Sequence, residues 1–336
     1  MQFLRKLLVT AACACPMVAA SAATTWTMAS GYPESSFFTQ NIRQFIKEVE
    51  TESQGRLKVD LRSNDTLVKH DAIKRAVQAG QIQAGEIRLG VYGNENPMYI
   101  LDGLPNISAN YEEAALLTDA QKPYFDKLLG KNGLRAITYV AWPGQGFFTK
   151  TPVSAPADFK GKKLRIYSQP TQKMGQMLGF QATILPFAEV AQAFATGLID
   201  SLFTSAQTGI DTQVWDNCKY FMYTGTLHNK NVVIINERAF RALEPDVQKI
   251  VLAAGERATK RGFEMSRKAG EDTVETLRKN GITVTQAGPE VQKALADVGQ
   301  AMVADWRKSA SPDEQKVLDN YLAAKAAQAP AKTAAN

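Results

Sequence analysis

Apolar residues follow two different spacings along the chain after residue 23. In some stretches every second residue is apolar, as at Leu57, Val59 and Leu61, which is typical of a strand with one buried face. In others the apolar positions recur every three or four residues, which is typical of an amphipathic helix. The first spacing predicts strands at 24–29, 57–61, 83–90, 134–141, 163–167, 181–185, 199–203, 220–224, 231–235 and 282–285. The second predicts helices at 36–53, 68–79, 112–129, 172–178, 187–196, 208–215, 237–279 and 289–308.

The order of these elements predicts an α/β protein. Strands and helices alternate over residues 24–90, which implies parallel strands joined by right-handed crossovers. The segment 142–150 contains the Pro143-Gly144 break and precedes a new strand-helix alternation, so we predict a crossing between two domains there. The helical pattern at 237–279 would reach about 60 Å at 1.5 Å per residue, enough to lie across both domains.

We expect a first domain and a second domain, each made of two pieces of the chain. The first combines residues 24–147 with 229–270, and the second combines 148–228 with 271–325. An end rich in Ala, Lys and Pro predicts a disordered tail over 326–336, which could begin as early as Ala323.

The first 23 residues have the organisation of an export signal. Arg5 and Lys6 precede an apolar run over 7–20, and the small residues Ala20-Ser21-Ala22 offer a cleavage site. The run is too short to span a membrane. We therefore expect an exported chain that begins at Ala23 or Thr24.

Cysteine positions limit covalent attachment and cross-linking. Cys13 and Cys15 lie inside the predicted signal, with Thr10 and Ala12 where a lipoprotein site would have an aliphatic residue, so no lipid is expected. The processed chain then keeps Cys218 alone, which excludes an internal disulfide bond. A small buried apolar side chain is the expected role of Cys218.

Charge disfavours nucleic acid as a partner, and the lengths of the apolar runs disfavour a membrane-embedded protein. Removal of Arg5 and Lys6 lowers the formal net charge from +6 to +4, and the remaining Lys and Arg are spread among acidic residues. A nucleic-acid surface would need a clustered basic stripe with interleaved aromatic residues. No apolar run after residue 23 is long enough to span a bilayer, so we expect a soluble protein.

Common catalytic and cofactor motifs are missing from the sequence. There is no phosphate-binding loop, nucleophile elbow, zinc-protease motif or Cys-His metal spacing, and the two histidines, His70 and His228, are far apart. We predict no metal and no cofactor. This favours binding over catalysis, although an unfamiliar active site stays open as an alternative.

Arg165 is the strongest candidate for contact with a ligand. It lies in the strand predicted at 163–167 and points away from the apolar face. In α/β proteins clefts lie outside the strand ends, where a guanidinium offers a fork of donors to a carboxylate. An exposed surface arginine is the alternative. Arg88, near the end of the strand predicted at 83–90, is the second candidate for the charge.

Several short motifs resemble, in order and spacing, the solute-binding proteins of tripartite ATP-independent periplasmic (TRAP) transporters, the DctP-like family. The turn Asp158-Phe159-Lys160-Gly161 before Lys163-Leu164-Arg165 is one of them. The others are Gly55-Arg56-Leu57-Lys58-Val59, Ala76-Val77-Gln78-Ala79-Gly80, Leu101-Asp102-Gly103-Leu104-Pro105, Pro186-Phe187-Ala188-Glu189-Val190 and Thr196-Gly197-Leu198-Ile199-Asp200. The resemblance covers about residues 25–306.

This resemblance implies a two-domain periplasmic binding protein fold with a hinge and a long domain-spanning helix. It also implies a periplasmic receptor without enzymatic activity, whose partner is a membrane permease. By the same resemblance, Arg165 pairs with the ligand carboxylate, and the loop carrying Tyr92 and Asn94 lines the cleft. The chain departs from the family at Gly146, where a second arginine is frequent, and at Thr204, where a ligand-binding asparagine is frequent.

These departures predict a less polar pocket, because a pocket tends to match the polarity of its ligand. Trp142, Phe147 and Phe148 also lie near the expected cleft. The aromatic residues that we predict to contact the ligand are Tyr167, Phe203 and Trp215. The expected ligand is a small monocarboxylate with an apolar or aromatic body, such as a 2-oxo or 2-hydroxy acid. An exported enzyme acting on a carboxylate and a ligand-binding sensory module remain alternatives.

Overall fold

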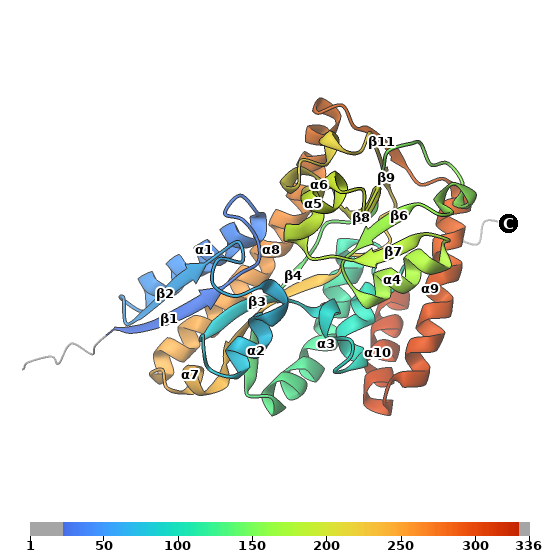
Figure 1. Ribbon diagram of the computed structural model, residues 1–336. Helices are drawn as coiled ribbons and strands as arrows, with labels where there is room; N and C mark the ends of the chain where they lie inside the picture. Colours follow the sequence, from blue (N-terminus) through green and yellow to red (C-terminus); the bar gives the residue numbers. More distant parts are fainter. Residues whose placement is uncertain (1–22, 329–336) are drawn as a thin grey trace, which may run out of the picture.

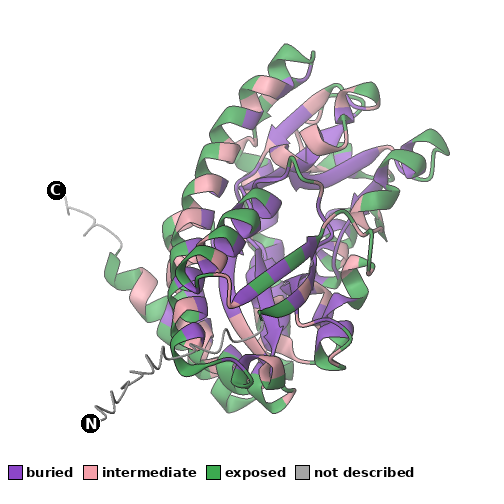
Figure 2. Cartoon of the chain, turned by 90° about the vertical axis from the view of Figure 1, so that its left-hand side faces the viewer, coloured by how far each residue is buried: buried purple, intermediate pink, exposed green. Residues whose placement is uncertain are grey.

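The chain folds into two lobes, each built on one β-sheet (Figure 1). The computed structural model describes residues 23–328. Apart from residue 23, the predicted export signal lies outside the described residues, as do residues 329–336 of the predicted tail. In Figure 2 the buried residues concentrate on the strands and on the inward sides of the helices.

The first lobe contains a five-stranded sheet in the order β2-β1-β3-β10-β4. β1 pairs in parallel with both β2 and β3, as the sequence predicts, and β10 pairs antiparallel with β3 and β4. Helices α1 and α8 cover one face, and α2 and α3 cover the other. The strands are β1 (Thr24–Ala29), β2 (Leu57–Arg62), β3 (Ala84–Arg88), β4 (Leu134–Ala141) and β10 (Lys230–Asn236). The first helices are α1 (Phe37–Glu52), α2 (Ile73–Gln78) and α3 (Tyr111–Lys131).

The second lobe contains a six-stranded sheet in the order β11-β9-β5-β8-β6-β7. β6 pairs in parallel with β7 and β8, whereas β5 runs antiparallel to β8 and β9. The strands are β5 (Gln145–Thr149), β6 (Lys163–Ile166), β7 (Gln181–Ile184), β8 (Ser201–Ser205), β9 (Tyr220–Tyr223) and β11 (Thr283–Gln286). The short helices here are α4 (Gln169–Met177), α5 (Val190–Ala195) and α6 (Ala206–Asp211). Residue 147, the predicted end of the first domain, falls inside β5, and all of β5 belongs to the second sheet.

One long helix connects the lobes. The α8 helix (Pro245–Lys279) has 35 residues and contacts α1 and β4 in the first lobe and α6 and β11 in the second. The nearly unbroken helical pattern predicted from residue 237 divides near Pro245, because α7 (Glu237–Arg241) ends before α8 begins. Pro245 has no N–H and disfavours a helical residue before it, and Glu244 is accordingly extended.

The C-terminal helices fasten the second lobe to the first. α9 (Pro289–Ser309) contacts α4 and the 3-10 helix η3 (Pro97–Gly103), and α10 (Pro312–Gln328) packs against α3. The Tyr321 hydroxyl donates to the Ile107 carbonyl, and Lys325 Nζ lies 2.7 Å from Glu113 Oε2. The expectation of a disordered tail is therefore wrong for residues up to 328, where these anchors and a run of strong helix formers continue α10.

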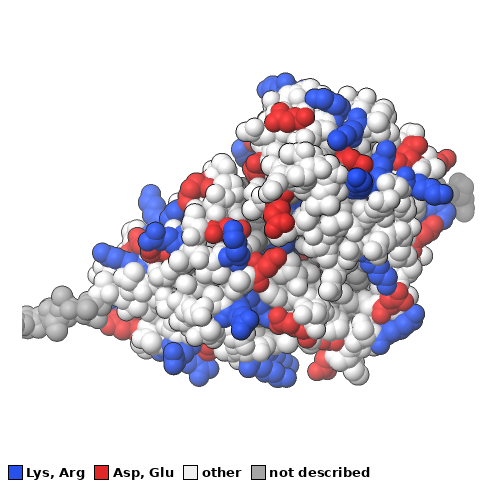
Figure 3. Space-filling view, in the orientation of Figure 1, with Lys and Arg blue, Asp and Glu red and all other residues white. Residues whose placement is uncertain are grey.

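Cys218 is buried in the core of the second lobe, among residues of α5, β8 and β9. Burial raises the pKa of its thiol to about 12, so the thiol stays protonated at neutral pH. On the surface, Lys and Arg are interspersed with Asp and Glu across the face shown in Figure 3, without a large area of one sign. Within residues 23–328, no helix is long and apolar enough to cross a membrane.

Candidate ligand-binding site

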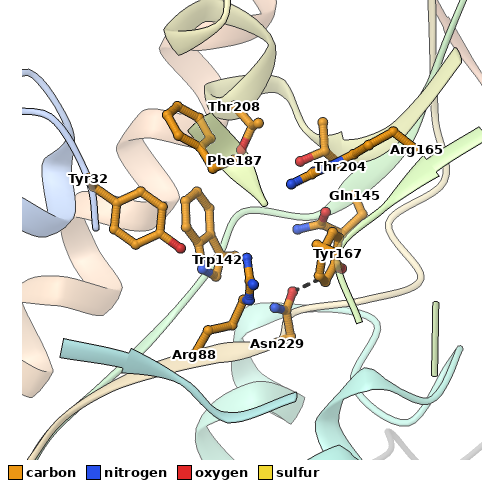
Figure 4. Close-up of a pocket in the computed structure, with 10 residues that line it drawn as sticks. All are labelled: Tyr32, Arg88, Trp142, Gln145, Arg165, Tyr167, Phe187, Thr204, Thr208 and Asn229. Atoms are coloured by element: carbon orange, nitrogen blue, oxygen red, sulfur yellow. Dashed lines mark hydrogen bonds between the residues drawn. The ribbon is translucent and has the colours of Figure 1, made fainter. Parts of the chain in front are cut away.

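A pocket that is partly open to solvent lies between the lobes (Figure 4). Its lining side chains follow the carboxyl ends of strands in both sheets or belong to the segments that cross between the lobes, where α/β proteins place their ligands. The lining residues are Tyr32, Arg88, Trp142, Gln145, Arg165, Tyr167, Phe187, Thr204, Thr208 and Asn229.

Arg165 places a buried positive charge in this pocket. It lies in β6, between β7 and β8, and is only 2% exposed. Its Nε donates to the Leu185 carbonyl at 3.1 Å, and within the described residues it forms no ion pair with a carboxylate. Burial, and secondarily the charge of Arg88, lowers the pKa of its guanidinium to about 9. A buried cation without a counter-charge is unfavourable, so this side chain is prepared for an anion.

Arg88 differs from Arg165 because it already has a carboxylate partner. It ends β3 and is 7% exposed, and its Nη2 lies 3.3 Å from Oδ1 of the exposed Asp71. The Tyr167 ring lies near both cations, with its centroid 5.8 Å from the guanidinium carbon of Arg88 and 5.7 Å from that of Arg165. Both arginines line the pocket, but only Arg165 lacks a carboxylate partner in the described chain.

Polar groups from three elements surround the space beside the arginines. Tyr167 Oη donates to Asn229 Oδ1 at 3.3 Å, drawn as a dashed line in Figure 4. Burial raises the pKa of this phenol, so it remains a neutral donor. Gln145 donates from Nε2 to the Pro143 carbonyl at 3.0 Å, while its buried Oε1 has no partner within residues 23–328. The pocket thus offers hydrogen-bonding groups of both kinds beside the unpaired charge.

Three aromatic rings form an apolar wall across the pocket from Tyr167 (Figure 4). The Tyr32 ring centroid lies 5.2 Å from that of Trp142 and 5.9 Å from that of Phe187. Trp142 is held by the segment before and at the start of β10: its N–H donates to the Asn229 carbonyl and its indole Nε1 to Asn231 Oδ1, both at 2.8 Å. Two hydrogen bonds therefore anchor Trp142 to the first lobe.

His228 also holds the crossing segment. Its Nδ1 lies 3.0 Å from the Trp142 carbonyl oxygen, which can only accept, so Nδ1 carries the hydrogen. Burial lowers the pKa of this imidazole to about 4, which keeps it neutral. His228 thus has a structural role beside the pocket, and no group of His, Cys, Asp or Glu in the described chain has the arrangement of a metal site.

Four of the nine side chains predicted to bind ligand line the pocket: Arg88, Arg165, Tyr167 and Thr204. Phe203 does not, because successive residues of a strand face opposite sides and Thr204 faces the pocket. Phe203 instead packs against Phe147, with ring centroids 4.8 Å apart. Trp215 is partly buried and packs against the core cluster of the second lobe, away from the pocket lining.

Tyr92, Asn94 and Gly146 also lie outside the pocket lining. Tyr92 is buried against Tyr99, with Lys74 Nζ 4.7 Å from its ring centroid, and Asn94 is exposed. A Cβ at Gly146 would lie 2.5 Å from the Met222 carbonyl oxygen, because β5 is enclosed between β8 and β9. The position where the family frequently has a second arginine therefore has no space for a side chain.

We expect Gly146→Ala to destabilise the protein by at least about 1–3 kcal/mol, the usual cost of overpacking. The nearest obstacle is backbone, which cannot rotate away as a flexible side chain can. Urea unfolding measures the effect. Gly130→Ala is the matched control, because Gly130 lies in α3 and a methyl group there would have nothing within 4 Å. Equal stability of Gly146→Ala and wild type would contradict this packing.

Six lining residues are absent from the predicted set: Tyr32, Trp142, Gln145, Phe187, Thr208 and Asn229. For three of them the sequence contains a weak indication of a place near the ligand. Trp142 and Gln145 lie in the segment predicted to cross between domains, and Phe187 lies in one of the motifs that carries the family resemblance. Tyr32, Thr208 and Asn229 carry no signal that distinguishes them from other polar or aromatic residues in loops and helix starts.

Comparison with known proteins identifies relatives over most of the chain. Residues 28–310 match the family model DctP, "Bacterial extracellular solute-binding protein, family 7". The C4-dicarboxylate-binding periplasmic protein DctP of Rhodobacter capsulatus is 25% identical and aligns with 71% of this chain and 73% of its own. Proteins of this family are extracytoplasmic solute-binding receptors.

Two solved structures from Bordetella pertussis are closely similar. DctP7, an extracytoplasmic solute receptor binding pyroglutamic acid, is 39% identical with a TM-score of 0.88, over 89% of this chain and 100% of that one. DctP6, also described as binding pyroglutamic acid, is 40% identical with a TM-score of 0.87 over the same shares. With the two-lobed fold, the spanning helix α8 and the family match over residues 28–310, the chain belongs to the DctP family of TRAP transporter solute-binding proteins.

Proposed function

We propose that the protein is a periplasmic receptor that captures pyroglutamate, or a closely similar cyclic monocarboxylate, and delivers it to a TRAP membrane permease. The observation that carries this proposal is Arg165, a buried cation without a carboxylate partner in the described chain. A ligand carboxylate would supply the missing counter-charge through a two-pronged pair with the guanidinium. The pyroglutamate receptors DctP6 and DctP7 of Bordetella pertussis support the choice of ligand.

The charge of the pocket favours one small monoanion. Arg88 is already paired with Asp71, so the pocket offers one unpaired positive charge. A dicarboxylate would bring a second charge that has no unpaired cation to meet it.

The two sides of the pocket suit a ring that carries an amide. Trp142 and Phe187 offer apolar surface to a flat ring, and Gln145, Thr204 and Asn229 offer donors and acceptors to its N–H and C=O groups. A 2-oxo or 2-hydroxy acid would satisfy Arg165 but would leave more of these polar groups unpaired, which is unfavourable. We therefore place pyroglutamate ahead of those acids.

The composition of the lining favours a receptor over an enzyme. None of the ten lining residues is a carboxylate, a histidine or a cysteine, the groups that most often act as a general base or nucleophile. The enzyme alternative would require turnover of the bound acid, which mass spectrometry of ligand recovered after incubation would reveal.

Isothermal titration of the processed protein with L-pyroglutamate tests the proposed ligand. We expect one molecule to bind per chain. L-proline, which lacks the ring carbonyl and carries a protonated ring nitrogen, should bind at least about tenfold more weakly, because a polar group of the pocket stays unpaired and a further positive charge enters beside the arginines. Succinate and pyruvate complete the panel. Absence of pyroglutamate binding, or tighter binding of succinate, would contradict the proposal.

We also expect ligand to close the two lobes. Trp142 and Gln145 lie in the segment that crosses between the sheets, and Arg165 and Arg88 approach the pocket from different lobes, so a bound molecule would bridge them. Small-angle X-ray scattering should give a smaller radius of gyration with saturating ligand than without it. Identical scattering curves, in a sample where titration proves binding, would exclude closure.

A further inference from the structure

We propose that Glu86 is a positioning residue for the ligand pocket and holds the indole of Trp142 in place through Asn231. The proposal rests on the proposed function, because its effect on affinity is measured with pyroglutamate. Glu86 is not part of the pocket lining. It lies in the middle of β3 and is 1% exposed, two residues before Arg88.

A continuous chain of hydrogen bonds runs from Glu86 to the pocket wall. Asn231 Nδ2 donates to Glu86 Oε1 at 2.9 Å, and Trp142 Nε1 donates to Asn231 Oδ1 at 2.8 Å. An ionised carboxylate can only accept and an indole N–H can only donate, so the Asn231 amide has one satisfactory orientation. The carboxylate thereby fixes the amide, and the amide fixes the Trp142 ring that faces the pocket.

The other carboxylate oxygen reaches a second part of the same wall. Ser30 Oγ donates to Glu86 Oε2 at 2.5 Å, and the Tyr32 N–H donates to Ser30 Oγ at 3.4 Å. Tyr32 and Trp142 are adjacent rings of the apolar wall. One buried carboxylate therefore connects to two of the three aromatic residues against which the ligand ring would lie.

The surroundings of Glu86 bring the pKa of its carboxyl group close to neutral pH. Burial raises the pKa of Glu86 to about 7, opposed by the hydrogen bonds from Ser30 and Asn231 and by the charge of Arg88. The neighbouring titratable groups stay fixed in this range: burial lowers the pKa of His70 to about 3 and raises that of Tyr32. The charge that α8 contributes nearby, Arg261, is already balanced, because Arg261 contacts Asn41 of α1 and is paired with Glu48.

The charge state of Glu86 should also affect ligand binding. Ionised Glu86 disfavours an anion in the pocket, so the affinity for an anion should fall as pH rises through about 7.

Binding measurements separate positioning from general stability. We expect Glu86→Ala to weaken L-pyroglutamate binding about five- to hundredfold, the range expected when a buried donor loses its partner. Glu314→Ala is the matched control, because Glu314 is also a buried carboxylate that accepts from two side chains, Asn96 and Tyr124, yet lies outside the pocket lining. It should keep affinity within about threefold of wild type.

A conservative variant and a double variant test whether Glu86 acts on the pocket through Asn231 and Trp142. Glu86→Gln can still accept from Asn231, so it should keep affinity within about threefold at pH 6 and lose the fall in affinity between pH 6 and 8. Trp142→Phe removes the indole N–H and ends the chain of hydrogen bonds. Glu86→Ala should therefore weaken binding much less in the Trp142→Phe background than in wild type.

A measurement without ligand keeps this proposal distinct from the proposed function. The indole N–H signal of Trp142, assigned with Trp142→Phe, should shift with pH around a midpoint near 7 in wild type and stay constant in Glu86→Gln. If wild type does not bind pyroglutamate, the proposed function fails and this signal still decides the role of Glu86. A Trp142 indole signal that does not move between wild type and a folded Glu86→Ala, or a folded Glu86→Ala that binds within about threefold of wild type, would overturn the proposal.

Discussion

Arg165→Ala should weaken pyroglutamate binding by about thirty- to several-thousand-fold. Removing one partner of a buried, hydrogen-bonded charge pair costs about 2–5 kcal/mol, and each 1.4 kcal/mol is a factor of ten. The remaining arginine cannot compensate, because Arg88 is paired with Asp71. Isothermal titration, with folding checked by thermal melting, measures the loss.

Arg165→Lys should also bind poorly, because a compact ammonium does not reproduce the planar fork of a guanidinium. Lysine has a methylene group at the position of Nε, so it would also give up the hydrogen bond that Arg165 Nε donates to the Leu185 carbonyl. Arg278→Ala, on the exposed face of α8, is the control and should bind as wild type does. If both Arg165 variants bind within about threefold of wild type, the counter-charge lies elsewhere and Arg88 becomes the residue to replace.

Lys230→Met should destabilise the protein by about 3–5 kcal/mol, the cost of removing one partner from a buried ion pair. Lys230 Nζ lies 3.3 Å from Asp102 Oδ2, and the two side chains are 0% and 1% exposed. Burial lowers the pKa of Lys230 and raises that of Asp102, so each charge depends on the other. Urea unfolding at pH 8 measures the loss. Lys293→Met, which breaks an exposed pair with Asp297, should change stability by less than about 1 kcal/mol.

The pH dependence and a double variant check that the buried Lys230–Asp102 pair is the cause of the lost stability. Without Lys230, the pKa of Asp102 in the folded state rises further, so the loss should be largest at high pH and should shrink as acid protonates Asp102. Asp102→Asn combined with Lys230→Met removes both charges but leaves an acceptor for the backbone N–H of residue 230. This double variant should recover most of the lost stability; if it is no more stable than Lys230→Met, the pair is not the cause.

Local patterns predict the strands well because strands are decided by short-range alternation. β1 and β4 begin and end where the sequence predicts, and the parallel pairing of β1 with β2 and β3 is confirmed. Errors arise where tertiary contacts, and not the local sequence pattern, decide the structure of a segment. The end of α10 looks like a disordered tail in the sequence, but Tyr321 and Lys325 dock it on the segment before α3 and on α3 itself.

The pocket is harder to predict because its residues come from ten positions spread between residues 32 and 229. Arg165 can be singled out because its place in a short strand and the resemblance of the surrounding motifs to TRAP solute-binding proteins point to the same residue; the strand alone would leave an exposed surface arginine as the alternative. Phe203 and Thr204 show the limit: they are neighbours in β8, and only the register against β5 and β6 decides which one faces the pocket. Asn229 cannot be found at all, since its place depends on how the segment before β10 meets Tyr167.

The buried thiol of Cys218 makes this chain suitable as a fluorescent sensor. A chain that begins at Thr24 contains no other cysteine, and Cys218 is 0% exposed, so a maleimide dye would not react with it in the folded protein. Ile184 is exposed at the end of β7 and directly precedes Leu185, whose carbonyl accepts from Arg165. A dye attached at Ile184→Cys would therefore sit beside the pocket without occupying it, and we expect its emission to change when a solute binds.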